Sequence, residues 1–164
     1  MKHATFTIRT GEDADWTALG QAVANIQDFE HEIVGYPLRP GRDIWEDYLS
    51  DLRHRLTADK GVFLVAEANR EIVGVLAGYA HKAGDCLVAS EFDRSAYISD
   101  LFVQSEWRRQ GIGTALMREF ERTMLAKGLH WMTVYIKSKN KTARQAYENY
   151  GFEDYEVILT KRLL

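Results

Sequence analysis

Apolar residues along the chain recur at two different spacings, which separate predicted strands from predicted helices. Strict alternation over residues 4–9 predicts an opening strand. Two amphipathic helical patterns follow, the first capped by Asp13 or Asp15 and the second beginning at Asp43. The chain therefore begins with a strand and two helices.

The remaining pattern favours strands and helices in alternation. Residues 62–68 and 72–80 are apolar runs separated by three polar residues, which predicts a β-hairpin with a short turn. A longer polar connection is expected over residues 82–94. The other predicted elements are a strand at 97–103, a helix from about 112, a strand at 131–137, a helix at 140–152 and a last strand at 154–161. This order, β-α-α-β-β-β-α-β-α-β, predicts an α/β fold.

The helix after residue 112 begins with a turn that suits an anion. Its first amides have no partner within the helix, and the helix dipole adds about half a positive charge there. No acidic residue lies between Glu106 and Glu119 to meet this field. Gly111 and Gly113 lack the Cβ atoms that would hold a bulky phosphate away from the backbone. The turn is therefore predicted to bind a pyrophosphate, although an ordinary glycine-containing turn would show the same residues.

Two common phosphate-binding motifs fit this turn poorly. A P-loop needs Lys and then Ser or Thr after its last glycine, but Thr114 and Ala115 follow Gly113. A dinucleotide-binding fingerprint needs a third glycine where this chain has Leu116. The anion is therefore expected to belong to another class of ligand.

The spacing R-x-x-G-x-G, met at Arg108, Gly111 and Gly113, resembles the acetyl-CoA pyrophosphate motif of the GNAT superfamily of N-acetyltransferases. A second stretch, NKTARQAYENYGF at residues 140–152, also resembles this superfamily in its order of Asn, Ala, Tyr and terminal Gly-Phe. The resemblance implies a GNAT-type fold over a single domain at residues 1–164. It implies a mixed central sheet of about six or seven strands flanked by about four helices.

The resemblance also implies which residues bind acetyl-CoA, the expected co-substrate. The pantetheine arm would pair with the main chain where two central strands splay apart, and Tyr147 would protonate the departing CoA thiolate. Asn140 has a simpler role available as a helix N-cap, and both roles are expected. The implied cofactor-binding residues are Phe102, Val103, Arg108, Arg109, Gln110, Gly111, Ile112, Gly113, Thr114 and Asn140.

The general base is less well defined by the sequence. An alkylamine with a pKa of about 10.4 is almost fully protonated at neutral pH, so it must lose a proton before it attacks. Some relatives place Glu-Asp on the central strand where this chain has Ser99 and Asp100, and Asp100 is the remaining carboxylate. A water relay ending at Asp100, or at the acidic residues between Asp28 and Glu32, is the expected route.

The first two helices and their loop are expected to hold the acceptor. Carboxylates and aromatic rings both attract cations, so we expect a small cationic amine such as a polyamine or an aminoglycoside. A protein or peptide amino group is the alternative acceptor, and a non-catalytic acyl-CoA-binding domain is the alternative class. The candidate acceptor residues are Asp28, Glu30, Glu32 and Tyr36, with Asp43, Trp45, Glu46, Asp47 and Tyr48 nearby.

Composition and charge narrow these possibilities. Residues 1–100 carry 17 acidic and 10 basic side chains and residues 101–164 carry 7 and 11, which suits a polyphosphate in the second half. The net charge of −3 gives little support to nucleic-acid binding, and the start of the chain lacks an apolar leader. We expect a cytoplasmic protein with no membrane partner, either as a monomer or as a homodimer. The scattered histidines and the single cysteine, Cys86, predict neither a metal site nor a covalent intermediate.

Overall fold

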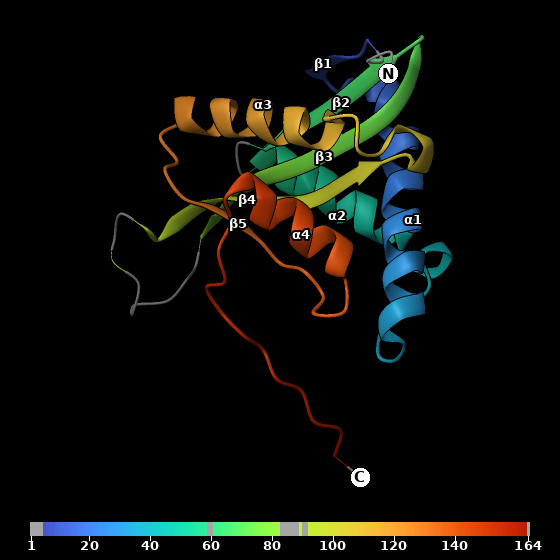
Figure 1. Ribbon diagram of the computed structural model, residues 1–164, viewed down its shortest axis with the longest axis vertical. Helices are drawn as coiled ribbons and strands as arrows, with labels where there is room; N and C mark the ends of the chain where they lie inside the picture. The colour runs from blue at the N-terminus through green and yellow to red at the C-terminus, as the bar shows by residue number, and fades with distance from the viewer. Residues whose placement is uncertain (1–4, 59–60, 83–88, 90–91, 164) are drawn as a thin grey trace.

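Five strands form one mixed sheet, in the order in which they follow along the chain (Figure 1). The computed structural model describes residues 5–58, 61–82, 89 and 92–163. The strands are antiparallel except for the last pair, which is parallel. Their bounds are β1 Thr7–Thr10, β2 Val62–Ala68, β3 Glu71–Lys82, β4 Arg94–Val103 and β5 Met132–Val134.

Four helices cover the two faces of this sheet (Figure 1). The helices α1, Trp16–Val34, and α2, Trp45–Ala58, pack against one face. The helices α3, Ile112–Ala126, and α4, Lys141–Tyr150, pack against the other. Short 3-10 turns at Asp13–Asp15, Gly41–Asp43 and Ser105–Trp107 lead into α1, α2 and the α3 loop. None of the described helices is long and apolar enough to span a membrane.

The sheet therefore has a hydrophobic core on each face, and β2 shows why its sequence is apolar throughout. Leu64 and Ala66 are buried in the core under α3, whereas Phe63 and Val65 are buried in the core under α1 and α2. Successive side chains of a strand point to opposite faces, so a strand covered on both sides needs apolar residues at every position.

The hairpin between β2 and β3 is formed as predicted. Its two turn residues, Asn69 and Arg70, both have positive φ angles, 53° and 67°. Two consecutive residues of this conformation make the type I′ turn, whose twist matches that of the paired strands. β3 is longer than expected and continues through Lys82.

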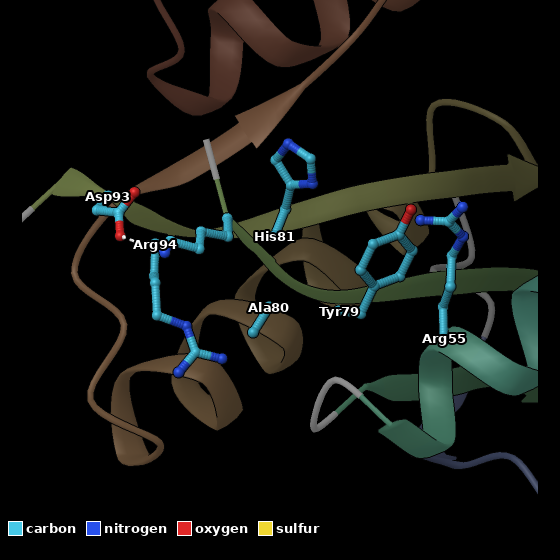
Figure 2. Close-up of a pocket in the computed structure, with 7 residues that line it drawn as sticks. Arg55, Tyr79, Ala80, His81, Asp93 and Arg94 are labelled. Atoms are coloured by element: carbon cyan, nitrogen blue, oxygen red, sulfur yellow. Dashed lines mark ion pairs between the residues drawn. The ribbon is translucent and has the colours of Figure 1, made fainter. Parts of the chain in front are cut away.

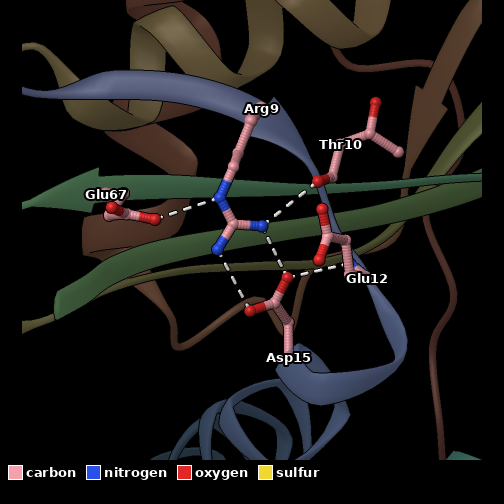
Figure 3. A network of polar contacts seen from close by, with 5 residues as sticks. All are labelled: Arg9, Thr10, Glu12, Asp15 and Glu67. Atoms are coloured by element: carbon pink, nitrogen blue, oxygen red, sulfur yellow. Dashed lines mark hydrogen bonds and ion pairs between the residues drawn. The ribbon is translucent and has the colours of Figure 1, made fainter. Parts of the chain in front are cut away.

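An arginine joins β1, β2 and the start of α1 (Figure 3). The Arg9 guanidinium donates to both carboxylate oxygens of Asp15, at 2.6 and 3.1 Å, and to Oε2 of Glu67 at 3.0 Å. Asp15 also accepts from the backbone N–H of Glu12 at 2.8 Å. These bonds hold the pKa of Asp15 below its usual value, the Arg9 bond being the largest cause. The network fixes the direction in which α1 leaves the sheet.

The predicted α/β order of elements is confirmed through α4, but two strand predictions are wrong in extent. The expected last strand at residues 154–161 is absent, and every residue of 153–163 is exposed without strand pairing. β5 spans three residues instead of 131–137, so the sheet has five strands, not six or seven. Alternation is a local property, whereas a strand needs a neighbouring edge for its hydrogen bonds. Within the expected connection at 82–94, residues 83–88, which include Cys86, and 90–91 lie outside the described residues.

Candidate active site

A β-bulge in β4 decides which way its carboxylate points. Ala77 and Gly78 of β3 are consecutive, but their partners on β4 are Asp100 and Ile98, so Ser99 is the extra residue. The Ser99 hydroxyl donates to the carbonyl of Ala77 at 3.0 Å. Without the bulge, Asp100 would share the face of Ile98, under α3. With it, Asp100 turns toward α2.

On the α2 side of the sheet, the Asp100 carboxylate is buried and hydrogen-bonded. The residue is only 7% exposed, and its Oδ2 accepts from the hydroxyl of Tyr48 on α2 at 2.8 Å. Burial raises the pKa of Asp100 to about 6, because water no longer stabilises the charge, and the Tyr48 bond opposes this rise. The carboxyl group can therefore gain and lose a proton close to neutral pH.

The N-terminus of α4 meets α1 beside this carboxylate. Asn140 caps α4, as predicted, with its Oδ1 accepting from the N–H of Ala143 at 3.0 Å. Its Nδ2 donates to Glu30 of α1 at 3.4 Å, a long contact between residues far apart in the sequence. The charge of Glu30 contributes to raising the pKa of Asp100. Glu30 is therefore part of the site. The sequence alone had placed it only among the acidic residues between Asp28 and Glu32.

Tyr147 presents a free hydroxyl to the same region. The residue is 8% exposed, and its ring packs edge-on against Phe152 with centroids 5.3 Å apart. Within the part of the chain that the structure describes, no group hydrogen-bonds to its hydroxyl. Burial raises the pKa of Tyr147, with smaller effects from Asp100, Tyr97 and Glu30. The hydroxyl therefore stays protonated and can donate to a ligand.

The two parallel strands separate at the level of Asp100. The β4–β5 pairing ends with Ile98 opposite Val134, so the rest of β4 has no partner strand on that side. Phe102 and Val103 lie in this unpaired part and are half-buried, with their side chains packed against the two cores. This end of β4 has no β5 partner, and the pairing of Phe102 and Val103 with a pantetheine arm stays a prediction.

The turn that follows β4 leads directly into α3. Gly111 has a φ of 85°, a left-handed conformation that favours glycine, and α3 begins at Ile112 with no acidic residue in its first turn. A Cβ atom at Gly111 would meet nothing within 4 Å, and one at Gly113 would meet only Val103, at 3.9 Å. The space above the first amides is open, which fits the approach of a phosphate group.

The polar side chains of this turn are exposed. Arg108 donates from Nε to the carbonyl of Val103 at 3.0 Å, and Gln110 donates to the carbonyl of Glu106 at 3.0 Å. Arg109 and Thr114 also lie at the surface. All the residues predicted to contact the CoA phosphates therefore lie around the start of one helix, beside the unpaired end of β4.

The residues predicted to bind the acceptor do not form one cluster. Asp28 accepts from the backbone N–H of Gly41 at 2.6 Å, which gives it a structural role at the start of the α1–α2 connection. Glu32 is exposed, and Tyr36 is 85% exposed. Asp43, Trp45, Glu46 and Asp47 are also exposed. Of this set, Tyr48 contacts Asp100 directly, and Glu30 acts on it only through its charge.

The structure adds a row of tyrosines that sequence reasoning missed. Tyr97 of β4 has its ring 5.4 Å from Tyr79 of β3 and 5.4 Å from Tyr135, just after β5. The ring of His81 lies 5.7 Å from Tyr97 as well. Each is an unremarkable aromatic residue near the end of a strand, and only the strand register brings them together.

A cavity of about 450 Å³ opens at the Tyr79 end of this row (Figure 2). Arg55 lies over the Tyr79 ring at 5.7 Å, and Lys82 pairs with Asp93 at 3.6 Å. The cavity is lined by Arg55, Tyr79, Ala80, His81, Lys82, Asp93 and Arg94. Three cations and one carboxylate line it, and Arg55 is also paired with Asp51 at 2.7 Å, so Arg94 supplies most of the positive charge of this basic cavity. No group of three or more potential metal ligands occurs among the described residues.

The chain is similar in sequence pattern and in fold to known acetyltransferases. The acetyltransferase (GNAT) family matches residues 21–152. A predicted acetyltransferase from Clostridium acetobutylicum, solved with acetyl-CoA, has a TM-score of 0.74 at 18% identity, covering 96% of each chain. The aminoglycoside 6'-N-acetyltransferase AAC(6')-Ih from Acinetobacter baumannii has a TM-score of 0.68 at 15% identity, covering 98% of this chain and 99% of its own. AAC(6')-Iy, bound to a bisubstrate analogue, has a TM-score of 0.71 at 16% identity, with 98% and 99% coverage.

The chain belongs to the GNAT family of acetyltransferases. It is an acyltransferase whose co-substrate is acetyl-CoA. The solved structures show that the fold is shared, at identities too low to carry an acceptor from one protein to another.

Proposed function

We propose that the protein transfers acetyl from acetyl-CoA to the primary amine of a small molecule, by direct attack within a ternary complex. The observation that carries this proposal is the position of Asp100 and Tyr147. Both are buried where β4 loses its partner strand, one as a carboxyl group that titrates near pH 6 and the other as a free hydroxyl. A proton acceptor and a proton donor at one opening suit a reaction that removes one proton and delivers another.

The start of α3 and the end of β4 together hold the co-substrate. The open amides after Gly111 receive the pyrophosphate, and Arg108 and Arg109 add positive charge at the surface. The main chain of Phe102 and Val103 pairs with the pantetheine arm in place of the missing strand. Gln110, Ile112, Gly113, Thr114 and Asn140 complete this binding surface.

Acetyl-CoA, when bound, supplies the activated acetyl group, and the chain's own residues manage the protons. Asp100 takes a proton released by the amine, directly or through one water, and Tyr48 holds the carboxylate in place. Tyr147 donates its hydroxyl proton to the leaving sulfur. A backbone N–H near Val103 stabilises negative charge on the carbonyl oxygen. This division gives Asp100, Tyr48 and Tyr147 one role each.

Glu30 favours an acceptor with a second positive group, because this carboxylate of α1 contacts Asn140 and its charge acts on Asp100. Two structural neighbours, AAC(6')-Iy and AAC(6')-Ih, are aminoglycoside acetyltransferases, which supports the same choice. The basic cavity beside Tyr79 favours a second candidate, an amine that also carries an anionic group. The two candidate acceptors differ in the sign of their second charged group, so a comparison of substrates can distinguish them.

The first experiment incubates the protein with acetyl-CoA and a panel of primary amines while free thiol is followed. Thiol release that depends on an amine, with acetylated amine as the product, supports the proposal. Tight binding of acetyl-CoA without thiol release across the panel would instead support an acyl-CoA-binding domain. The Asp100→Asn variant serves as the matched control, because it keeps the size of the side chain and removes the base.

The second experiment compares three amines of equal length: a diamine, a monoamine and an ω-amino carboxylate. A higher kcat/KM for the diamine, which shrinks as salt rises, supports recognition by Glu30. A higher value for the amino carboxylate supports the basic cavity, and Arg94→Gln should then remove the advantage. Equal values for all three would leave the protein or peptide amino group as the better acceptor.

A further inference from the structure

Two tyrosine rings lie together on the α2 face of the sheet, next to the point where β4 and β5 separate. Val134 and Ile136 pack into the core under α3, so Tyr135 between them points to the opposite face. Tyr97 packs on that face as well, and the two tyrosine rings are 5.4 Å apart. Tyr135 is 62% exposed, and its hydroxyl has no hydrogen-bond partner among the described residues. The open ring of Tyr135 is therefore available to a ligand.

The bulge at Ser99 places the Asp100 carboxylate on this same face. Asp100 pairs with Ala77 of β3, two positions before the partner of Tyr97. The side chains of Tyr97 and Asp100 therefore leave β4 on the same side, from positions roughly 7 Å apart along the strand. Burial raises the pKa of Tyr97, and the charge of Asp100 adds to this rise, so the two groups lie within electrostatic reach. A molecule whose amine reaches Asp100 over the open part of this face has its body beside the tyrosine rings.

The far end of the tyrosine row favours an uncharged ring over a second cation. The ring of Tyr79 stands edge-on to Tyr97 at 5.4 Å. The guanidinium of Arg55 already lies over the Tyr79 ring at 5.7 Å, and an ion pair of 2.7 Å with Asp51 holds it there (Figure 2). A second cation bound along the row would be repelled by this guanidinium. A neutral aromatic ring meets no such repulsion, and it can contact Tyr97 and Tyr135 at the tilted angles that aromatic pairs prefer.

We infer that the acceptor is an arylalkylamine, whose aromatic ring packs on Tyr97 and Tyr135 while its primary amine reaches Asp100. This acceptor class rests on the proposed function and adds to it the body of the molecule. A chain of two or three carbon atoms between ring and amine spans the roughly 7 Å between the two positions on β4. Tyr135 determines specificity, because it is the open member of the row. A second charged group of either sign would then be a substituent of the same molecule, near Glu30 or near Arg94.

The first test compares amines that differ only in their body. Ethylamine, 2-cyclohexylethylamine and 2-phenylethylamine are each incubated with acetyl-CoA, and the N-acetyl amide and free CoA are measured as products. Burial of the ring should raise kcat/KM for 2-phenylethylamine about tenfold over ethylamine. It should exceed the cyclohexyl amine by about two- to tenfold, because aromatic pairs gain more than the burial of area. Equal values for the two ring-bearing amines would overturn the inference and leave the proposed function standing.

The second test removes the open ring. Tyr135→Ala should lower kcat/KM for 2-phenylethylamine about tenfold and leave the value for ethylamine unchanged. Tyr135→Phe is the matched control, since it keeps the ring and loses only a hydroxyl that has no described partner. The side chain is exposed, so both variants should keep the thermal midpoint of the wild type. The same loss with both amines in Tyr135→Ala, or the same loss in Tyr135→Phe, would contradict recognition of the acceptor by this ring.

The length of the carbon chain tests where the ring lies. The series runs from benzylamine, with one carbon atom, to 4-phenylbutylamine, with four. A ring held on Tyr97 and Tyr135 should give the highest kcat/KM at two or three carbon atoms. A steady rise through the series, as each added methylene group buries more apolar area, would show that the ring has no fixed place.

The third test measures binding without turnover. The fluorine NMR signal of 2-(4-fluorophenyl)ethylamine is recorded with the protein and CoA, which carries no acetyl group to transfer. The signal should broaden with the wild type and with Tyr135→Phe, and it should stay sharp with Tyr135→Ala. If no amine releases thiol from acetyl-CoA, the proposed function fails, and this signal decides separately whether the ring binds. A sharp signal with the wild type would refute the aromatic acceptor whatever the turnover of other amines.

Discussion

The hydroxyl of Tyr48 on α2 donates to Oδ2 of Asp100 on β4 at 2.8 Å. This bond joins the helix layer to the bulge at the point where β4 and β5 separate. It stabilises the charged carboxylate, whereas burial of Asp100 favours the neutral acid. The balance of these two effects leaves the pKa of Asp100 at about 6. Substitution of either Asp100 or Tyr48 should therefore change the rate of acetyl transfer.

Replacing Tyr48 with Phe should shift the pH dependence of turnover. In the wild type, kcat is expected to rise with pH through about 6, as Asp100 loses its proton. Because the Tyr48 bond lowers the pKa of Asp100, Tyr48→Phe should move this rise to higher pH, by about one unit or more. The measurement is a pH profile of kcat. An unchanged profile in Tyr48→Phe would remove Asp100 as the base.

Asp100→Asn should make the protein more stable at pH 8 while abolishing acetyl transfer. The folded pKa of Asp100, about 6, lies above its ordinary 3.8, so the unfolded chain releases this proton first. Stability is therefore lost as pH rises from about 4 to 6, and the full penalty, about 3 kcal/mol at most, remains above that. Asparagine keeps the Tyr48 bond and avoids the penalty.

The matching measurement is chemical denaturation of both proteins at pH 8 and pH 3.5. A gain of about 1–3 kcal/mol in the variant at pH 8, vanishing at pH 3.5, is expected. An equal difference at both pH values would mean that the gain does not come from the ionisation of Asp100.

Gly113→Asp should weaken acetyl-CoA binding without harming the fold. Position 113 is the second residue of α3, where an acidic side chain stabilises a helix, and an added Cβ meets only Val103 at 3.9 Å. The new charge lies where the pyrophosphate is expected, so the dissociation constant of CoA should rise at least tenfold, or by about 1.4 kcal/mol. Titration calorimetry measures this change.

Ala126→Asp, at the other end of α3, provides the control for Gly113→Asp. It adds the same charge to the same helix at an exposed position far from the turn. Its affinity for CoA should equal that of the wild type. If both variants bind CoA equally, the start of α3 is not the phosphate site.

Tyr147→Phe should lower kcat about a hundredfold and leave the affinity for acetyl-CoA nearly unchanged. The ring can keep its contact with Phe152, and no described group loses a hydrogen bond. The thermal midpoint should therefore stay the same. Tyr150→Phe is the control, because its hydroxyl bonds to Glu121 on the surface. Full turnover in Tyr147→Phe would mean that the thiolate leaves without this proton.

The features that the sequence predicted correctly are local ones. The Asn69–Arg70 turn, the Asn140 cap and the open start of α3 each depend on a few consecutive residues and their backbone conformation. Local hydrogen bonds and φ angles are nearly independent of the rest of the chain, so their residue types identify them. The order of elements through α4 follows from the same kind of information.

The partners of Asp100 depend on contacts between distant residues. Tyr48 and Glu30 lie 52 and 70 positions earlier in the chain, and no spacing rule connects either to β4. The tyrosine row needs the register of three strands, which a shift of one residue would undo. Sequence reasoning therefore proposed Asp100 and Tyr147 as catalytic residues without predicting which side chains surround them.

By itself, the sequence determined the strands and helices through α4, the acetyl-CoA motif and the family resemblance. Each rests on residue periodicity or on a short motif with its own backbone geometry. Only the tertiary structure decided that Asp100 faces α2 and that residues 153–163 stay outside the sheet. Both outcomes depend on pairing along strand edges. One inserted residue in β4 turns the following side chain to the opposite face, and an alternating segment forms a strand only if a neighbouring strand pairs with it.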